Sequence, residues 1–566
     1  MTPCSYIIYN FKRRNIMTTR PDFSANTIDN SAAMHKTRFS LAGIVFLIFC
    51  MCAAGAFGVE DMIPSVGPGL TIALLIIIPI LWAIPMGIYT AELGALAPVD
   101  AGPYVWMRMA YGEMWGFCMN WWLMLAIYLG QAAYVVIAVG YIGQIISLTP
   151  LAATIIKIAI VVILTIVNLI GLKEVSILST IFSIIIIVMF ALVTIVGFAN
   201  WNYNPVDPFI PEGTDVVSSL GTGLAIGIWL YCGYIQISNL GGEIANPEIV
   251  PKGMKVSIIV IALNFLLPTI AGLASLGNYQ NWGTGIGDGT LNYSSVLITY
   301  TGPALGVAFM IMAVISSCST TNSVIASGSR LFLTLAEDNL CPSFLAKLTK
   351  KSKMPFWPII ILAAVTIIFV NFDFSMIVNI VSPVLFILYV GLAFAFLKIR
   401  KKYPVEERTV WYAKGGKLLK AYVIGGMFLM GFVGIMVNGL EFFTLSFLIT
   451  ASGLVFYVIF KRLYGGLAVN DPDSYPVNPK TGLAQGDIWR IGIFFMVFGI
   501  LMFVGSFVIG WYEGSWGPDY YLSTYGDCFL GDFYAMINTC RWCGLGGAVL
   551  GIIFFIAGIK TDRNPS

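Results

Sequence analysis

The sequence predicts an all-α polytopic membrane protein with about fourteen transmembrane helices, and three observations predict it. Of its 566 residues, 58% are hydrophobic and only 10% are charged, whereas about 25% of residues are charged in soluble proteins. Apolar runs of about 20 residues, long enough to cross a bilayer, recur along the chain. The lysines and arginines fall in alternate gaps between these runs, as the positive-inside rule requires of cytoplasmic loops.

The apolar runs set the number and order of the predicted spans. These spans are 41–66, 69–96, 115–146, 151–171, 175–199, 218–244, 253–276, 302–327, 357–371, 374–397, 420–437, 442–460, 489–510 and 543–559. Every lysine and arginine except Lys157 and Arg541 lies in the first tail, in an even-numbered gap or at the last end. We therefore expect a multi-pass protein of the cell (plasma) membrane with both termini cytoplasmic. For Lys157, snorkelling to the outer interface is favoured over a role in a pathway.

The order of the spans suggests a repeat. Spans 1–5 and 6–10 are odd in number, so two equivalent halves would run in opposite directions through the bilayer. The predicted units are a polar tail (1–39), two five-span repeats (40–199 and 218–397), helices 11 and 12 (418–460), and a cytoplasmic loop with helices 13 and 14 (461–566).

Each half begins with a span that glycines interrupt. In the first, Gly55 and Gly58 precede the acids Glu60 and Asp61, although a charge at bilayer depth costs roughly 2.5–3.5 kcal/mol. A break that forms a substrate site explains this pattern, and so does a short helix whose outer end carries the acids. In the second, Cys232-Gly233 interrupts the run. Interrupted segments at matching positions of two halves favour a transporter binding site, although either glycine alone could serve packing.

Four motifs carry a resemblance to a known family. They are the break from Gly55 to Gly58; Ala91-Glu92-Leu93 with Pro98, Gly102 and Tyr104; Gly241-Gly242-Glu243-Ile244-Ala245-Asn246-Pro247 with Pro251-Lys252; and Ser329-Arg330 with Ala336, Asp338, Leu340 and Pro342. Over about residues 40–460 the chain resembles the amino acid–polyamine–organocation permeases, and Phe57-Gly58-Val59-Glu60 is most similar to their polyamine and L-type branch. Ala101 departs from the family's double glycine in the second motif.

The resemblance implies a five-plus-five inverted-repeat (LeuT-like) core with helices 1 and 6 broken. Substrate would bind at the breaks, with its carboxylate on free N–H groups of the first break and its ammonium group on free carbonyls of the second. The implied binding residues are Ala54, Gly55, Ala56, Gly58, Trp229, Leu230, Tyr231, Cys232 and Gly233. Trp229 matches an aromatic that lines or gates the site, and interior packing is its alternative.

A second group of residues is expected to gate or couple transport. Glu60 fits an acceptor of an amine or a proton, and equally a solvated charge of the outer vestibule. Glu243 and Glu92 fit gating or structural carboxylates better than substrate ligands. Ser316 and Ser317 lie among hydroxyls that could help to bind sodium or could cap their own helix. In the family's proton-coupled members a lysine stands near the position of Ile186. This chain lacks that lysine, and coupling to sodium or to protons stays open.

Other chemistries are disfavoured by composition. The single histidine, His35, lies in the polar tail, so we expect no catalytic site, no metal site and no cofactor. Ten cysteines are present; most of those within spans suit a packing role, while Cys528 with Cys540 or Cys543 suits a disulfide if that loop faces an oxidising space. Scattered basic residues argue against nucleic acid as a partner. The oligomeric state is left open.

The sequence thus predicts a secondary active transporter, a permease for amino acids or related amines that works by alternating access as a symporter or an exchanger. A polyamine or organic-cation transporter of the same fold is the alternative. A channel would need a selectivity filter and a receptor a large domain outside the bilayer, and neither feature is evident.

Overall fold

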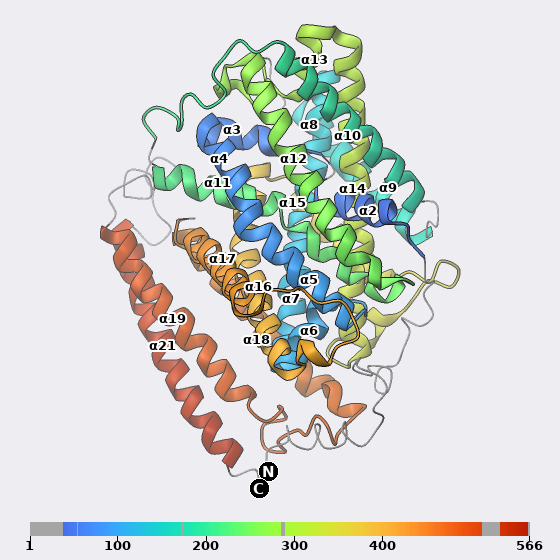
Figure 1. Ribbon diagram of the computed structural model, residues 1–566. Helices are drawn as coiled ribbons and strands as arrows, with labels where there is room; N and C mark the ends of the chain where they lie inside the picture. The colour runs from blue at the N-terminus through green and yellow to red at the C-terminus, as the bar shows by residue number, and fades with distance from the viewer. Residues whose placement is uncertain are drawn as a thin grey trace.

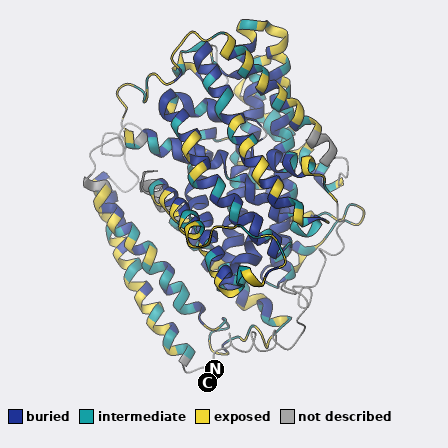
Figure 2. Cartoon of the chain, viewed as in Figure 1, coloured by how far each residue is buried: buried dark blue, intermediate teal, exposed yellow. Residues whose placement is uncertain are grey.

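The computed structural model describes residues 38–53, 55–170, 175–214, 216–284, 289–437, 440–511 and 533–563. Ala54, the polar tail before Arg38 and Cys528 lie outside these residues. The described chain forms a helical bundle (Figure 1). Buried residues fill its interior, and exposed apolar residues lie mainly on the outer helices (Figure 2), as a lipid-facing surface requires.

The first half of the bundle contains the helices of the first repeat. They are α2 (Leu41–Cys52), α3 (Val59–Val66), α4 (Pro68–Ile78), the π-helical turn η2 (Pro79–Ala83), α5 (Ile84–Leu96), α6 (Gly102–Tyr111), α7 (Glu113–Gly130), α8 (Ala132–Ile145), α9 (Pro150–Ile170) and α10 (Val175–Ala199). Ser40 caps α2, because its hydroxyl accepts the N–H of Gly43 at 3.0 Å. Proline begins α4, where a missing N–H costs little. Pro79 lies inside the continuous helix Pro68–Leu96, where it removes a hydrogen bond of the helix interior, and the π-helical turn η2 begins at this residue.

The second half and the C-terminal helices follow. They are α11 (Val216–Leu230), the 3₁₀ helix η3 (Gly233–Asn239), α12 (Val250–Leu276), η6 (Tyr279–Asn281), α13 (Tyr293–Thr301), α14 (Pro303–Glu337), α15 (Phe356–Phe369), α16 (Phe374–Lys402), α17 (Gly416–Val437), α18 (Leu440–Tyr464), α19 (Asp487–Trp511) and α21 (Phe533–Arg563).

Twelve helices of the described residues are long and apolar enough to cross a membrane. The shorter apolar helices α2 and α15 lie in the two remaining predicted spans. The all-helical membrane fold is therefore confirmed, and the count of fourteen crossings stays a prediction.

Contacts between the two halves come in matched pairs. The first span packs on the seventh (α2 on α12), and the sixth packs on the second (α11 on α4). Likewise the fifth span packs on the seventh (α10 on α12), and the tenth packs on the second (α16 on α5). Two repeated five-span units would produce such exchanged contacts.

The bundle has two chemically different ends. One end, the basic end, holds the segments in which the lysines and arginines gather. Its segments are joined by ion pairs of Arg108, Arg330, Arg400 and Lys461. At the opposite end, the loop after α10 contacts the end of α12, where the N–H groups of Asn202 and Tyr203 donate to the carbonyl of Ala274 at 2.8 and 2.9 Å. The two ends thus group the loops as the alternation of charge predicts.

Helices α19 and α21 form a hairpin beside the core (Figure 1). Their backbones approach closely at glycines. A Cβ on Gly499 would lie 2.4 Å from the backbone nitrogen of Ala548, and one on Gly551 would lie 2.4 Å from that of Met496. Small residues allow such packing between membrane helices. The hairpin contacts the core through α18 and through Phe494 of α19, whose ring packs near those of Trp115 and Trp122 on α7.

Candidate functional site

The first break lies between α2 and α3. Helix α2 ends at Cys52 and α3 begins at Val59, so Glu60 and Asp61 stand in the first turn of a second half-helix. Gly55 and Gly58 have φ angles of 131° and 94°, a region that only glycine adopts at low cost. The interrupted span is therefore a broken helix, not one short helix that ends at the acids.

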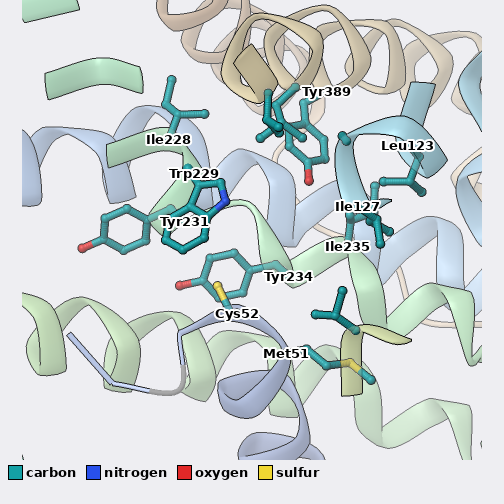
Figure 3. Packing of buried hydrophobic residues seen from close by; sticks show 14 of the residues in the cluster. Met51, Cys52, Leu123, Ile127, Ile228, Trp229, Tyr231, Tyr234, Ile235 and Tyr389 are labelled. Carbon is teal, nitrogen blue, oxygen red and sulfur yellow. The ribbon is translucent and has the colours of Figure 1, made fainter. Parts of the chain in front are cut away.

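The second break lies against the first. Helix α11 ends at Leu230 and η3 begins at Gly233. A Cβ on Gly233 would lie 2.3 Å from the Cα of Cys52, so glycine is needed for this close approach. The Cys52 thiol donates to the carbonyl of Leu230 at 3.7 Å. Figure 3 shows Cys52 beside Tyr234, where the two segments meet.

A small cavity adjoins the second break. Its volume is about 30 Å³, about that of one water in the liquid, so the breaks are closed around it in this conformation. Its lining combines apolar side chains with aromatic and amide groups, among them Gln131, Tyr134, Trp229, Cys232, Gln236 and Tyr389. The Tyr389 hydroxyl donates to the carbonyl of Cys232 at 2.7 Å, which holds a carbonyl that α11 no longer uses.

Trp229 connects this cavity to the first break. Its ring packs on Tyr134, with ring centres 4.9 Å apart, and edge-on against Phe374 at 5.2 Å. The ring of Phe374 also covers Gly58, where a Cβ would lie 2.8 Å from it. Two aromatic rings therefore separate the cavity from the backbone of the first break.

The predicted residues of the second break do not all point their side chains into the cavity. Tyr231 points away from the cavity lining: its hydroxyl donates to the carbonyl of Leu75 at 3.3 Å, and its ring packs on Phe265. Figure 3 shows the Tyr231 hydroxyl pointing away from the Trp229 ring. The side chain of Tyr231 thus anchors α11 to its neighbours, while its backbone remains at the break.

At the first break, Gly55 and Ala56 are buried behind rings. A Cβ on Gly55 would lie 2.4 Å from the ring of Phe57 and 2.7 Å from that of Phe190. No hydrogen bond from the N–H of Gly55 or Ala56 is recorded to another described residue. A carboxylate could use these N–H groups only after the rings move.

Glu60 is fully buried at the start of α3. One carboxylate oxygen accepts the hydroxyl of Tyr141, and the other accepts the N–H of Gly58 at 3.1 Å. No salt bridge to Glu60 occurs among the described residues. The interpretation of Glu60 as a solvated vestibule charge does not fit this conformation. A buried carboxylate without a cation has the chemistry to take up a proton or an ammonium group.

Both carboxylate oxygens of Asp61, the neighbouring acid, already accept hydrogen bonds. Its two oxygens accept the N–H of Thr284 at 3.0 Å and the hydroxyl of Thr284 at 2.5 Å. Asp61 therefore ties the outer half-helix α3 to the loop that follows η6.

The two predicted gating carboxylates both form ion pairs at the basic end. Glu243 accepts the Nε–H of Arg330 at 2.8 Å. Glu92 is fully buried and accepts hydrogen bonds from Arg400, Arg408 and the N–H of Ala413. Both therefore connect helix ends rather than face the cavity.

The hydroxyls of α14 bond mainly within the helix. Thr320 and Thr321 donate to the carbonyls of Ser316 and Ser317, which is the self-capping alternative. The Ser317 hydroxyl is buried without a hydrogen-bond partner among the described residues. No group of three or more His, Cys, Asp or Glu side chains that could hold a metal ion occurs in the part of the chain described.

The structure also gives the contacts of Lys157, which the sequence places near the outer interface, and of Asn292. The Lys157 ammonium donates to the carbonyl of Val370 at 2.9 Å, at the end of α15. Asn292, the first residue of an Asn-Tyr-Ser sequence, is buried and caps α13, so it is closed to modification. The disulfide predicted for Cys528 lies outside the described residues.

Sequence reasoning missed several residues that surround the breaks. Tyr141, Phe374, Tyr389 and Gln131 come from helices far away in the chain. The amide of Gln131, buried in an otherwise apolar span, was the one usable signal, because polar groups inside a membrane usually have a role.

The chain is similar in sequence to known membrane proteins. The family model described as amino acid permease matches residues 39–463. A probable polyamine transporter of Arabidopsis thaliana is 28% identical over 66% of this chain and 74% of its own length. A polyamine transporter of the same plant is 26% identical, over 66% and 75%. An uncharacterised transporter of Mycobacterium bovis is 24% identical, over 57% and 71%.

Proposed function

We propose, from the premise that this chain belongs to the amino acid permease family, that it is a secondary carrier of amines which works by alternating access. The family and its relatives make the chain a membrane transporter of small molecules. The finer part of the proposal is the substrate class, a polyamine or another organic cation, and a place in the cell membrane with the basic end and both termini cytoplasmic.

The single observation that carries the substrate class is the burial of Glu60 without a cation. The carboxylate is fully buried and accepts the hydroxyl of Tyr141, whose ring packs edge-on against that of Phe57. An ammonium group would supply the missing charge, and a charge-assisted hydrogen bond to it is worth roughly 1.5–3 kcal/mol. The names of two relatives as polyamine transporters support the same class.

Transport of neutral amino acids is the second candidate. It rests on the N–H groups of Gly55 and Ala56, which could hold a carboxylate. Gly55 and Ala56 are buried in this conformation, as Glu60 is, so either ligand would reach the first break only after the surrounding side chains move; the buried carboxylate without a salt bridge is what favours the amine.

The test is uptake into proteoliposomes with the variant Glu60→Gln, which keeps the shape of the side chain and removes the charge. We expect putrescine to lose at least about tenfold in affinity, since about 1.4 kcal/mol is tenfold, while a neutral amino acid loses little. Asp61→Asn is the matched control, because the Asp61 carboxylate is already occupied by Thr284.

Separate pH and sodium gradients identify the coupling ion in the same assay. If Glu60 carries a proton, Glu60→Gln binds putrescine normally but loses the response to the pH gradient. Uptake like that of the parent under every gradient would contradict both roles of Glu60. Uptake of neutral amino acids alone would reject the amine class.

A further inference from the structure

A second cavity lies at the opposite end of the bundle from the basic end. Its volume is about 170 Å³, several times the roughly 30 Å³ that one water occupies in the liquid. It forms where the loop after α10 meets the start of α4 and the end of α12. Its polar and aromatic lining is Tyr203, Asn204, Asp207, Asn278 and Tyr279.

The walls of this outer cavity are fixed by the backbone on both sides. The N–H groups of Gly69 and Leu70 donate to the carbonyls of Pro208 and Phe209 at 3.3 and 2.8 Å. On the other side, the ring of Tyr203 lies on Gly277, where a Cβ would be 2.9 Å away. The loop is thus held against α4 and α12, and the cavity is a stable part of the surface.

The charge of the outer cavity is negative. No hydrogen bond or ion pair of the Asp207 carboxylate is recorded among the described residues. The described segments that build this region, 200–214 and 277–284, contain no lysine or arginine. Their acids are Asp207 and Glu212. A cation would therefore be attracted to the cavity and an anion repelled.

The side chains that line the outer cavity favour one class of cation. The rings of Tyr203 and Tyr279 line the cavity, and aromatic rings attract ammonium groups; the amides of Asn204 and Asn278 offer oxygens that accept hydrogen bonds. A small metal ion would be expected to need several oxygen ligands at short range, whereas one carboxylate with aromatic rings suits an alkylammonium group.

We infer that this outer cavity is a second binding site for an organic ammonium ion, distinct from the helix breaks. It adjoins the path of the substrate, because η6 (Tyr279–Asn281) packs on α3, the half-helix that begins at the first break. The inference rests on the proposed function, since the amine bound there is of the class that the carrier moves. The site raises the local concentration of the amine beside α3 before the breaks open.

The experiment counts bound ligand. We would measure equilibrium binding of radiolabelled putrescine to the full-length protein in lipid nanodiscs, for the parent, Asp207→Asn, Glu60→Gln and Glu212→Gln. Glu212 is exposed on the same loop but does not line the cavity, so it is the matched control. We expect two putrescine molecules per chain for the parent and Glu212→Gln, and one for each of the other two variants.

The outcomes separate this site from the proposed function. One molecule per parent chain, lost in Glu60→Gln and kept in Asp207→Asn, would overturn the outer site and leave the amine carrier intact. Loss in Asp207→Asn alone would keep the outer site and reject the role of Glu60. No binding to the parent would overturn both.

A kinetic measurement adds a second, independent variant. We expect Asp207→Asn and Tyr279→Leu each to raise the KM for putrescine uptake about threefold with an unchanged maximal rate, as suits one exposed charge or one aromatic face. An unchanged KM in both variants would contradict the capture role.

Discussion

At the basic end of the bundle, ion pairs connect the helix ends; at the opposite end, single hydrogen bonds do so, and no salt bridge occurs there among the described residues. All six salt bridges of the described residues lie at the basic end, and Glu92, Arg400 and Lys461 are almost fully buried there. At the opposite end, Thr284 donates to Asp61, and Asn292 donates to Gln144 at 2.5 Å. The same helices thus end in very different environments.

This difference bears on alternating access. Removing one partner of a buried ion pair costs about 3–5 kcal/mol, whereas a hydrogen bond contributes about 0.5–1.5 kcal/mol when both groups are neutral and about 1.5–3 kcal/mol when one is charged. Opening toward the basic end would break several ion pairs, whereas opening toward the other end would break hydrogen bonds but no salt bridge of the described residues. We therefore expect the carrier to open first at the end that holds the outer cavity.

The largest loss of stability is expected for a substitution of Glu92. Glu92→Gln would leave Arg400 and Arg408 without their shared carboxylate in a buried position. We expect a loss of about 3–5 kcal/mol in the free energy of unfolding, seen as thermal unfolding of the detergent-solubilised protein at a much lower temperature. Glu407→Gln, on the exposed loop nearby, is the control. Stability like that of the parent would show that the cluster does not hold the basic end.

A smaller effect is expected at the pair of Arg330 and Glu243. Glu243 is 23% exposed, so water can replace part of what Arg330→Gln removes, and the loss should be about 1–3 kcal/mol. Because the pair joins α14 to the segment after η3, hydrogen exchange of Gly233–Asn239 should become faster. Lys347→Gln at the same end is the control, and unchanged exchange in that segment would argue against a gate there.

These contacts mark the limit of what the sequence could predict. Span positions followed from apolar runs, and the basic end followed from the alternation of lysine and arginine, because both signals are local. The breaks followed from Gly55, Gly58 and Gly233, since only glycine allows their conformation or close approach. The partner of Glu60 could not be found, because Tyr141 lies 81 residues away and no pattern links the two positions.

The direction of single side chains was also beyond prediction. Tyr231 belongs to the second break by position, but its side chain contacts Leu75 and Phe265 instead of the cavity. A helix end fixes where the backbone lies, and the neighbouring helices decide which way each side chain points. Asn292 is a second example. It begins an Asn-Tyr-Ser sequence of the kind that is N-glycosylated, but its side chain caps α13 and is buried.

The smallest loss of stability is expected for a substitution of Asp61. This substitution tests the contacts at the end opposite the basic end. In Asp61→Asn the side-chain oxygen can still accept the N–H of Thr284, and the amide can donate to the hydroxyl of Thr284, which can rotate to accept it. Only the charge assistance is lost, so we expect at most about 1 kcal/mol. Hydrogen exchange of the loop 277–284 should rise by no more than about fivefold, with global stability unchanged. Thr284→Val, which keeps the backbone N–H, should have an effect of similar size. If Asp61→Asn instead destabilises the protein as much as Glu92→Gln does, the two ends are closed equally firmly, and the expected order of opening is wrong.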